Sequence, residues 1–502
     1  MTPGEHLKWR TNAVLTGPQV VHVRSLLAAT TDLEETESYQ IALAPHKHLP
    51  AEILSLVFTL CIPAPIILPP APKAPALAIA QTCRRWRQTI LRTPNLWCNI
   101  FLDFTNCAKP LRLIVYAKQW LRQSDALITL RNSTSRWGER LLLKHDIDIV
   151  RELVVPFSSR YREIDLRFVE SSIDDFFCLP ERAIDNLEIL YLETLGVTMP
   201  FSASRLDVFR AGAPRLKRVL LSTDMCSLDP AVLGLPWGQL TALHFIATYI
   251  PPLAMHAIFR AAPNLEECSC SIVQMDDALV TDLERLPDCM LQHLRVLMVE
   301  FAPSADPASD HVSPFLRPLI LPALADLELR PLEAGFLPAT PFPYAAYQAL
   351  LARSRFTLSR LAILHYIIPV EQLLHVLQDM PSLVAFQLYL WETTEWDAEV
   401  LAGLRDGSLL PRLENLTFSM YPLDGVLDAL EGRVKLGNRE KATVARMREL
   451  NMEVTWRPDI SAQGMARFMR IAQAGELKCR AFTHTRTYAH DRTSTQVFAA
   501  SV

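Results

Sequence analysis

Glycine is scarce in this chain, with only 15 in 502 residues, and no glycine-rich loop occurs. The patterns G-x-x-x-x-G-K-[ST], G-x-G-x-x-G, H-E-x-x-H and G-x-S-x-G are all absent. The sequence therefore shows no phosphate cradle, zinc-peptidase helix or serine-hydrolase elbow. We expect no catalytic residues, although a catalytic set assembled only in three dimensions stays open as an alternative.

Metal-ligand spacing is also missing. The ten cysteines include no Cys-x-x-Cys, and the 13 histidines are scattered. We therefore expect no metal site and no cofactor. Cys268 and Cys270 lie two apart in an expected strand, where filling the core is a simpler interpretation than binding a metal. Free thiols of this kind predict a reducing compartment, cytoplasmic or nuclear, and residues 1–17 lack the apolar segment of a secretory signal.

The chain carries no strong excess of charge. Its formal net charge is -4, which provides no general attraction to nucleic acid or to an anionic membrane, so we expect neither partner. The one long apolar run, residues 60–80, contains six prolines and the single charge of Lys73. Repeated loss of backbone donors is costly in lipid, so this run predicts a loop with polyproline character rather than a membrane span.

Three short helices are predicted between residues 48 and 102. The first opens at Leu49-Pro50-Ala51-Glu52, because proline suits a first helical turn. Apolar residues then follow at the spacing of one helix face, which must be buried against something; they are Ile53, Leu54, Val57, Phe58 and Cys61. A second helix is expected over residues 76–89 and a short third helix over residues 93–97.

The same stretch resembles the F-box-like domain. It has the Leu-Pro-x-Glu-Ile-Leu opening, a Cys-Arg-x-Trp-Arg centre and a Thr-Pro-x-Leu-Trp close. The resemblance implies docking to a Skp-type adaptor and, through it, to the cullin of a ubiquitin ligase. It implies adaptor contacts and two tryptophans that hold the helices together; these are Leu49, Pro50, Ile53, Leu54 and Phe58 for the adaptor, and Trp86 and Trp97 for the helix core. The departure is the proline-rich insert at 63–75, and a helical cap on a repeat domain is the alternative.

A repeat follows. The pattern L-x-x-L-x-L, with other apolar residues allowed, occurs ten times with first anchors from Tyr161 to Leu413, an average step of 28 residues. Helix-like segments lie between the copies, and five copies are introduced by Pro-x-Leu. This period is typical of leucine-rich repeats. It predicts an α/β fold, an irregular solenoid with a parallel sheet on the concave side and helices on the convex side.

The expected domain organisation has five parts. They are a lead-in at 1–44 with at most one helix, an F-box-like domain at 45–98, a leucine-rich-repeat-like solenoid at 99–457, a capping helix at 458–474 and a disordered tail at 475–502.

Four acids are expected on the concave face. Glu267 and Asp326 each precede a buried anchor by one residue, Glu328 follows one, and Glu300 lies one pleat further on. Strand alternation turns such side chains away from the core. They form either a site for a basic segment of a protein substrate or an ordinary solvated face.

The resemblance, taken with the repeats, implies a substrate-recognition adaptor similar to the F-box-like repeat proteins of mushroom-forming fungi. It would bind a protein substrate whose identity the sequence does not give, and it would perform no chemistry. Two alternatives remain: a repeat scaffold that never meets a ligase, and a catalytic or GTPase-activating repeat protein. The last would typically have an acidic tail, whereas Asp491 is the only acid after Glu476.

Overall fold

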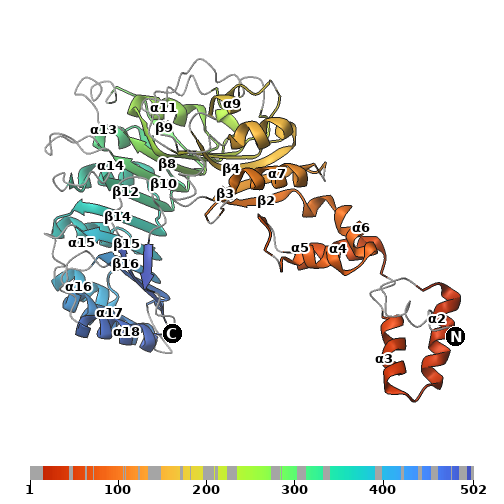
Figure 1. The fold of residues 1–502 in the computed structure, drawn as a ribbon. Coiled ribbons are helices and arrows are strands. Elements are labelled where there is room, and N and C mark those ends of the chain that lie inside the picture. The colour runs from red at the N-terminus through yellow and green to blue at the C-terminus, as the bar shows by residue number, and fades with distance from the viewer. Residues whose placement is uncertain are drawn as a thin grey trace. The chain divides into compact units, whose positions relative to one another are not determined.

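A computed structural model shows the fold of the chain (Figure 1). The residues that it describes are 15–44, 49–62, 65–71, 73–105, 107, 109–122, 125–133, 148–169, 173–180, 182–195, 209, 213–222, 234–272, 283, 285–301, 312–331, 340–390, 398–419, 423–438, 444–453, 462–475, 477–484 and 495–498. The chain divides into two compact units, Met1–Phe176 and Phe177–Val502. The division falls inside the stretch 99–457 that the repeat pattern assigns to one solenoid.

Unit 1 contains a helical hairpin near its N-terminus. Helix α2 (Gly17–Ala29) ends at Thr30, whose backbone is extended (φ -86°, ψ 142°). Helix α3 (Leu33–Ala42) begins after Asp32, whose carboxylate accepts a hydrogen bond from the backbone N–H of Glu34 at 2.9 Å. The sequence led us to expect at most one helix here. Two form because Asp32 caps a new helix soon after the first has ended.

The F-box-resembling stretch folds into short helices. They are α4 (Ala51–Cys61), α5 (Pro75–Thr82), α6 (Arg84–Leu91) and the 3-10 turn η2 (Pro94–Leu96). The second helix expected from the sequence is two helices, because Cys83 between them is fully extended (φ -160°, ψ 168°). The Cys83 sulfur accepts a hydrogen bond from the Trp86 backbone N–H at 3.4 Å and so caps α6.

The proline-rich insert contains a strand that the sequence did not indicate. Strand β1 (Ile66–Leu68) pairs in parallel with β2 (Asn99–Asp103), and Ile66 and Leu68 are buried. The expectation of a polyproline loop is therefore wrong for these three residues. Their lack of prolines leaves every backbone donor available to the sheet.

The rest of unit 1 alternates strands and helices. Its further elements are α7 (Pro110–Leu121), β3 (Ile128–Ser133), η3 (Val150–Val154), η4 (Val155–Arg160), β4 (Tyr161–Val169) and α9 (Ile173–Phe177), which crosses the division. Strands β2, β3 and β4 pair in parallel, and Ile100, Leu130 and Ile164 form one buried row across them.

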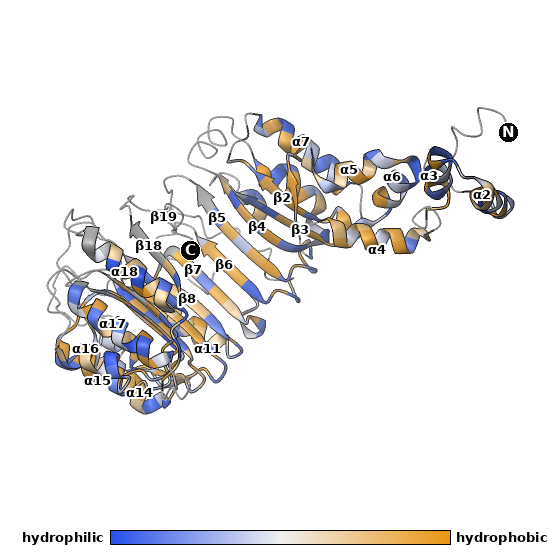
Figure 2. Ribbon diagram, turned by 90° about the horizontal axis from the view of Figure 1, so that it is seen from below, coloured by the Kyte–Doolittle hydropathy of each residue, from blue (hydrophilic) through white to orange (hydrophobic). Residues whose placement is uncertain are grey.

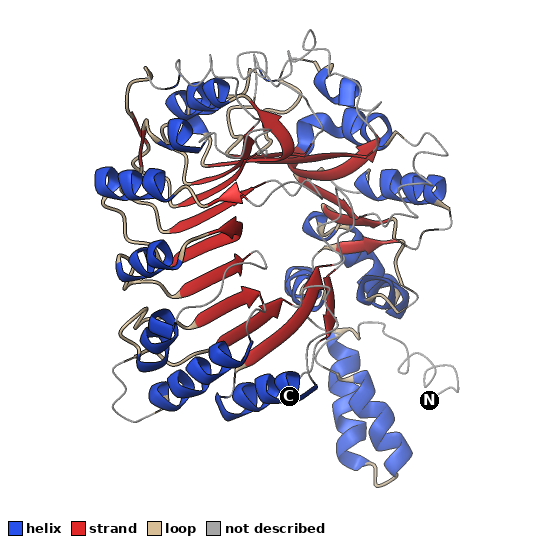
Figure 3. Cartoon of the chain, turned by 90° about the vertical axis from the view of Figure 1, so that its left-hand side faces the viewer, coloured by secondary structure: helices blue, strands red, loops and turns tan. Residues whose placement is uncertain are grey.

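Unit 2 is built on a parallel sheet with helices on one of its faces (Figure 3). The long strands that pair in chain order are β5 (Ile189–Leu195), β6 (Arg218–Ser222), β7 (Ala242–Ile250), β8 (Glu267–Ile272), β10 (Val296–Phe301), β12 (Asp326–Pro331), β14 (Arg360–Ile367), β15 (Ala385–Leu390), β16 (Asn415–Ser419) and β17 (Glu449–Glu453). Short strands are β9 (Cys289–Met290) and β11 (Leu319–Ile320), which pair with each other, and β13 (Thr340–Pro341), which pairs with β14. The helices are η8 (Trp237–Gln239), α11 (Pro252–Ala261), α13 (Val312–Leu316), α14 (Tyr344–Ser354), α15 (Val370–Gln378), α16 (Ala398–Asp406), α17 (Leu423–Gly437) and α18 (Ala462–Gly475).

The register of this sheet is the register of the sequence repeat. In unit 2 the second apolar anchor of each copy pairs with the second anchor of the next, and all of them are buried: Leu190, Val219, Leu243, Cys268, Leu297, Leu327, Leu361, Phe386 and Leu416. The predicted α/β class, with a large parallel sheet and many helices, is confirmed. The face that carries these anchors is the helix-covered face, and the other is called the open face below.

The C-terminal end differs from the expectation. Helix α18 covers most of the segment assigned to a capping helix, but the chain then continues the sheet instead of becoming disordered. Strand β18 (Lys478–His484) pairs in parallel with β17, and β19 (Thr495–Phe498) pairs with β18 in antiparallel fashion. Residues 458–461, 476, 485–494 and 499–502 of the two predicted segments lie outside the described residues.

Within the described residues, no helix combines the length and the apolar character that crossing a membrane requires.

Candidate functional site

Helix α4 carries an apolar stripe on its exposed side. Ile53, Leu56, Val57 and Leu60 are between 39% and 80% exposed, and their spacing of i, i+3, i+4 and i+7 places them on one helix face. Figure 2 shows α4 largely in the colour of apolar residues. Exposed apolar side chains that cluster in this way are typical of docking surfaces.

This exposed stripe differs from the face that the sequence predicted. Leu54 and Phe58 are each 1% exposed, and the Phe58 ring packs on the Trp86 ring with centroids 5.1 Å apart. These two residues therefore belong to the helix core in this structure, which leaves their side chains little surface for an adaptor contact. Of the remaining predicted contacts, Pro50 and Ile53 are exposed, and Leu49 is half-buried.

Two exposed residues were missed by the sequence analysis, Leu56 and Leu60. The signal was present, because residues 53, 56, 57 and 60 have helical spacing as good as that of residues 54, 58 and 61. Spacing alone does not say which of two overlapping apolar faces points inward. That choice depends on where α6 packs.

Hydrogen bonds fix α4 against α6. The Arg85 guanidinium donates to the Leu49 carbonyl oxygen. The Ser55 and Thr93 hydroxyls are 2.5 Å apart, and because Thr93 already donates to the Thr89 carbonyl, Ser55 is the donor. These bonds turn the Ser55 side of α4 toward α6 and leave the opposite side exposed.

The two predicted core tryptophans lie between the helices. Trp97 is buried, its indole Nε1–H donates to the Ile90 carbonyl at 2.8 Å, and its ring contacts the Trp120 ring of α7 with centroids 4.6 Å apart. Trp86 is half-buried against Phe58. Trp97 thus connects the helices to the first strand–helix unit of the sheet.

The stretch that contains α4 carries an excess of basic side chains. The stretch 49–98 contains five basic residues and one acid, a formal net charge of +4. Arg84, Arg87 and Arg92 of this set are exposed, and no recorded ion pair within the described part of the chain involves them. The exposed stripe of α4, which consists of Ile53, Leu56, Val57 and Leu60, is called the docking face.

The second candidate site is the open face of unit 2. Strand pairing places Glu267, Val296, Asp326 and Arg360 in one row across four neighbouring strands. The structure therefore brings the four predicted acids to one sheet face, as strand alternation requires.

Each of these acids has an arginine partner. The Glu267 carboxylate lies 3.0 Å from the Arg218 guanidinium, and that of Glu300 lies 3.4 Å from Arg330. Arg360 contacts two acids, Asp326 at 2.7 Å and Glu328 at 2.9 Å. The uncompensated acidic patch that motivated a basic substrate segment is therefore not present.

The sequence contained the signal for these arginines. Arg218 and Arg360 occupy the position before a buried anchor that Glu267 and Asp326 occupy in their own strands. Applying the register only to acids missed the two arginines that lie in the same row, Arg218 and Arg360. Opposite charges on neighbouring strands stabilise a sheet face, whereas like charges destabilise it.

Burial modifies these charges. Burial raises the pKa of the Asp326 carboxyl above its ordinary value, although the charge and hydrogen bond of Arg360 lower it. Burial alone would lower the pKa of Arg360, but hydrogen bonds and charge from Glu328 and Asp326 raise it overall. The guanidinium thus stays charged, and it neutralises two carboxylates in a partly desolvated position.

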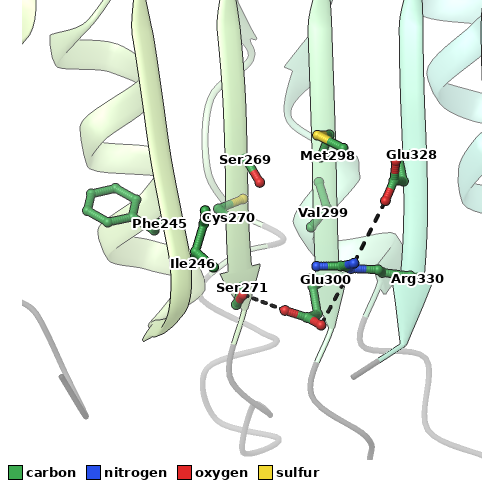
Figure 4. A pocket seen from close by; sticks show the side chains of 10 residues that line it. All are labelled: Phe245, Ile246, Ser269, Cys270, Ser271, Met298, Val299, Glu300, Glu328 and Arg330. Atoms are coloured by element: carbon green, nitrogen blue, oxygen red, sulfur yellow. Dashed lines mark hydrogen bonds and ion pairs between the residues drawn. The ribbon is translucent and has the colours of Figure 1, made fainter. Parts of the chain in front are cut away.

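A small hollow lies in the open face beside this network (Figure 4). Ser271 donates a 2.7 Å hydrogen bond to Glu300, and Arg330 lies between Glu300 and Glu328. The volume of about 30 Å³ holds a water molecule or two, whereas small-molecule sites usually measure about 300 Å³ or more. The other lining residues are Phe245, Ile246, Ser269, Cys270, Met298 and Val299.

Metal chemistry has no support in the described part of the chain, where no group of three or more His, Cys, Asp or Glu side chains is placed to hold an ion. Comparisons with known proteins add no assignment, since no protein-family model matches the chain and no curated protein is significantly similar to it.

Proposed function

We propose that this protein is a substrate-recognition adaptor of a cullin-based ubiquitin ligase. In this proposal the docking face binds a Skp-type adaptor, and unit 2 binds a protein substrate. The protein performs no chemistry itself. The observation that carries the proposal is the exposed apolar stripe of α4, which lies in the stretch 48–102 whose three ordered sub-motifs resemble the F-box-like domain.

Exposure of the stripe to water costs free energy, and a partner that covers the stripe removes this cost. Four large apolar side chains on one helix face expose area that water disfavours by roughly 25 cal/mol per Å². A partner helix or groove that covers them recovers this free energy, and truncated anchors typically lose about 2 kcal/mol each. The net charge of +4 over residues 49–98 favours an acidic partner surface.

The sheet of unit 2 supports the receptor role. Its open face combines arginine–acid pairs with a hollow too small for a metabolite, which suits contacts to a folded protein or peptide better than small-molecule binding. Parallel strands in successive repeats present side chains over an extended surface, as in other repeat proteins that bind proteins.

The test is co-purification from cells. The full chain is expected to retain a Skp-type adaptor and a cullin, identified by mass spectrometry. The double variant Val57→Asp with Leu60→Asp is expected to lose both, because two charges then occupy the stripe. The matched control is Leu111→Asp with Val115→Asp on α7, which changes side chains 59% and 54% exposed on another helix and should retain both proteins.

Retention of neither protein by the unaltered chain would contradict the proposal and favour a scaffold without ligase association. Equal retention by the two double variants would also contradict it, since the stripe would then not be the contact.

A further inference from the structure

The hollow in the open face is lined by an arginine whose donors are unused. The Arg330 guanidinium lies 3.4 Å from Glu300 and 3.9 Å from Glu328, and within the described residues it donates no hydrogen bond. Arg218 and Arg360, by contrast, donate to acids at 3.0 Å and 2.7 Å. A guanidinium carries five N–H donors in a fixed plane. The Arg330 side chain is 35% exposed and therefore offers these donors to a group that enters the hollow.

Two carboxylates beside Arg330 supply acceptors. One oxygen of Glu300 accepts a hydrogen bond from the Ser271 hydroxyl at 2.7 Å, and one oxygen of Glu328 accepts from Arg360 at 2.9 Å. The second oxygen of each acid accepts no hydrogen bond within the part of the chain that the structure describes. Figure 4 shows the two carboxylates with Arg330 between them. The hollow thus presents donors and acceptors side by side.

This mixed set of groups favours a neutral occupant. Three acids, Glu300, Asp326 and Glu328, pair with two arginines, Arg330 and Arg360, which leaves the network close to neutral. The acids would repel an entering carboxylate, and Arg330 would repel an entering ammonium group. A primary carboxamide has no charge, accepts hydrogen bonds through its oxygen and donates them through its nitrogen. It therefore satisfies Arg330 and the acids at the same time.

The geometry of the group favours a side chain over the main chain. In a trans peptide group the N–H and the C=O point to opposite sides, so a group lying against one wall of the hollow presents only one of them. The oxygen and the nitrogen of a side-chain carboxamide lie together at its tip. Asparagine and glutamine are the two side chains that carry this group. The chemistry of the hollow therefore points to one of these two residues in a protein partner.

The size of the hollow agrees with this occupant. Its volume of about 30 Å³ has room for a water molecule or two, which matches the oxygen and the nitrogen of one carboxamide. A ligand group that reproduces the hydrogen bonds of displaced water retains affinity. Ile246 and Met298 are half-buried and line the hollow beside its polar groups, so they provide an apolar contact for the methylene groups of the entering side chain.

We propose that this hollow is the specificity pocket of the open face and that it binds the carboxamide of a glutamine or asparagine in the protein substrate. Arg330 donates to the carboxamide oxygen, and Glu300 and Glu328 accept from its nitrogen. The inference rests on the proposed function for calling the partner a substrate, but not for the carboxamide binding itself. A site built for these hydrogen bonds should reject the isosteric carboxylate by at least about tenfold.

Methyl NMR of the full chain tests the pocket before any substrate is known. The methionine methyl groups are isotope-labelled, and the Met298 signal is identified by its loss in Met298→Leu. The probe, N-acetyl-glutamine N-methylamide at millimolar concentration, is expected to shift the Met298 signal to saturation, while the other methionines serve as internal references. The matched compound, N-acetyl-glutamate N-methylamide, has the same size and should bind at least about tenfold more weakly.

Single variants separate the pocket from its surroundings. Ser269→Leu fills the hollow but leaves its acids and arginines unchanged, so it should abolish the saturable shift. Arg330→Met removes the donors and should weaken binding of the glutamine analogue by at least about tenfold. The matched control, Glu449→Gln, changes a half-buried acid of the same sheet face on β17 and should bind the probe like the unaltered chain. Urea midpoints monitor the folding of each variant.

An exchange of specificity is the sharpest outcome, because unfolding does not produce one. Glu300→Gln with Glu328→Gln removes two negative charges from the pocket and should bind the glutamate analogue more tightly than the glutamine analogue. Absence of a saturable Met298 shift in the unaltered chain, or equal affinity for the two analogues, overturns the inference. If the chain retains no Skp-type adaptor, the proposed function fails while the titration still decides the pocket.

Random peptides displayed on phage then test the substrate role. Selection on the full chain should enrich glutamine or asparagine at one fixed position of the bound peptides, and selection on Ser269→Leu should not. The same peptides selected on both chains, or no preference for a carboxamide, would show that the hollow does not select the substrate.

Discussion

At the residue scale, Arg433 shows how this protein accommodates a charge without an acid beside it. The side chain is 1% exposed in helix α17, and its guanidinium donates to the carbonyl oxygens of Leu404, Leu409, Leu410 and Leu413, the closest at 2.6 Å. Burial lowers the pKa of Arg433 to about 10. One planar cation therefore satisfies the carbonyls at the end of α16 and in the following turn.

Replacing Arg433 with methionine should lower the free energy of unfolding by about 3 kcal/mol, because several buried carbonyl oxygens lose their donor. Arg433→Lys should recover only part of the loss, since an ammonium cannot reach all four oxygens. Urea unfolding measures both. The control is Arg412→Met at an exposed position, and an equal shift in the two methionine variants would contradict this role.

His256 is the other buried polar residue with a measurable consequence. It packs against the rings of Phe259 and Phe315, and its Nε2–H donates to the Phe315 carbonyl at 2.9 Å. Burial lowers the pKa of His256 from 6.5 to about 4, with the Arg260 charge acting in the same direction and the hydrogen bond to Phe315 opposing both. The imidazole is therefore neutral in the folded protein at neutral pH.

This shift sets a pH dependence of stability. Because the folded pKa lies below the unfolded one, the unfolded chain binds a proton first as the pH falls, and folding loses stability from about pH 6.5 down to about pH 4. Between pH 7 and pH 5 we expect a loss of about 2 kcal/mol from this residue. His256→Gln should remove that part of the slope in urea unfolding, whereas His293→Gln, at an exposed site, should leave it. An unchanged slope in His256→Gln would contradict this assignment.

At the scale of elements, the strands of unit 2 were easier to predict than the helices near the N-terminus. A shift of one residue in strand register would expose a whole buried row, so the apolar pattern alone specifies anchors such as Leu297 and Leu327. Helix breaks depend on single capping residues instead. Cys83 begins α6 inside a stretch where the apolar spacing predicted one continuous helix, and Asp32 begins α3 where the spacing predicted no second helix.

The sequence predicted the helix that carries the docking face but not which side of that helix is exposed. Sequence spacing identified α4 as amphipathic, but Leu54 and Ile53 have equal claims to the inward position until the packing of α6 is known. Likewise, the arginines that pair with acids on the open face come from other strands. Arg218 lies two strands and 49 residues away from Glu267, and Arg360 lies one strand and 34 residues away from Asp326. Such pairs follow from the register, not from local sequence.

Strand β1 provides a test at this scale. Leu68 is buried against the sheet and Ile67 is 54% exposed on its other face. Leu68→Asp should destabilise unit 1 by about 3 kcal/mol or more, because a carboxylate enters an apolar core, while Ile67→Asp in the same strand should cost less than about 0.5 kcal/mol. The urea midpoint of each variant measures this. Equal midpoints would show that β1 does not belong to the folded sheet.

At the scale of the whole molecule, the two compact units divide the proposed tasks. Unit 1 holds the docking face, and unit 2 holds the open face with its paired charges. The net charge of -4 conceals local imbalances, from -3 in residues 15–44 to +4 in residues 49–98. The imbalance lies near the N-terminus, whereas acids and arginines pair with each other on the open face.

The most direct test of the account is a calorimetric titration of the full chain with a purified Skp-type adaptor. We predict saturable one-to-one binding that Val57→Asp with Leu60→Asp weakens by at least about thirtyfold, the equivalent of about 2 kcal/mol. Leu111→Asp with Val115→Asp on α7 should bind like the unaltered chain. Absence of binding by the unaltered chain, or equal affinity of the two double variants, would contradict the assignment of α4 as the adaptor contact.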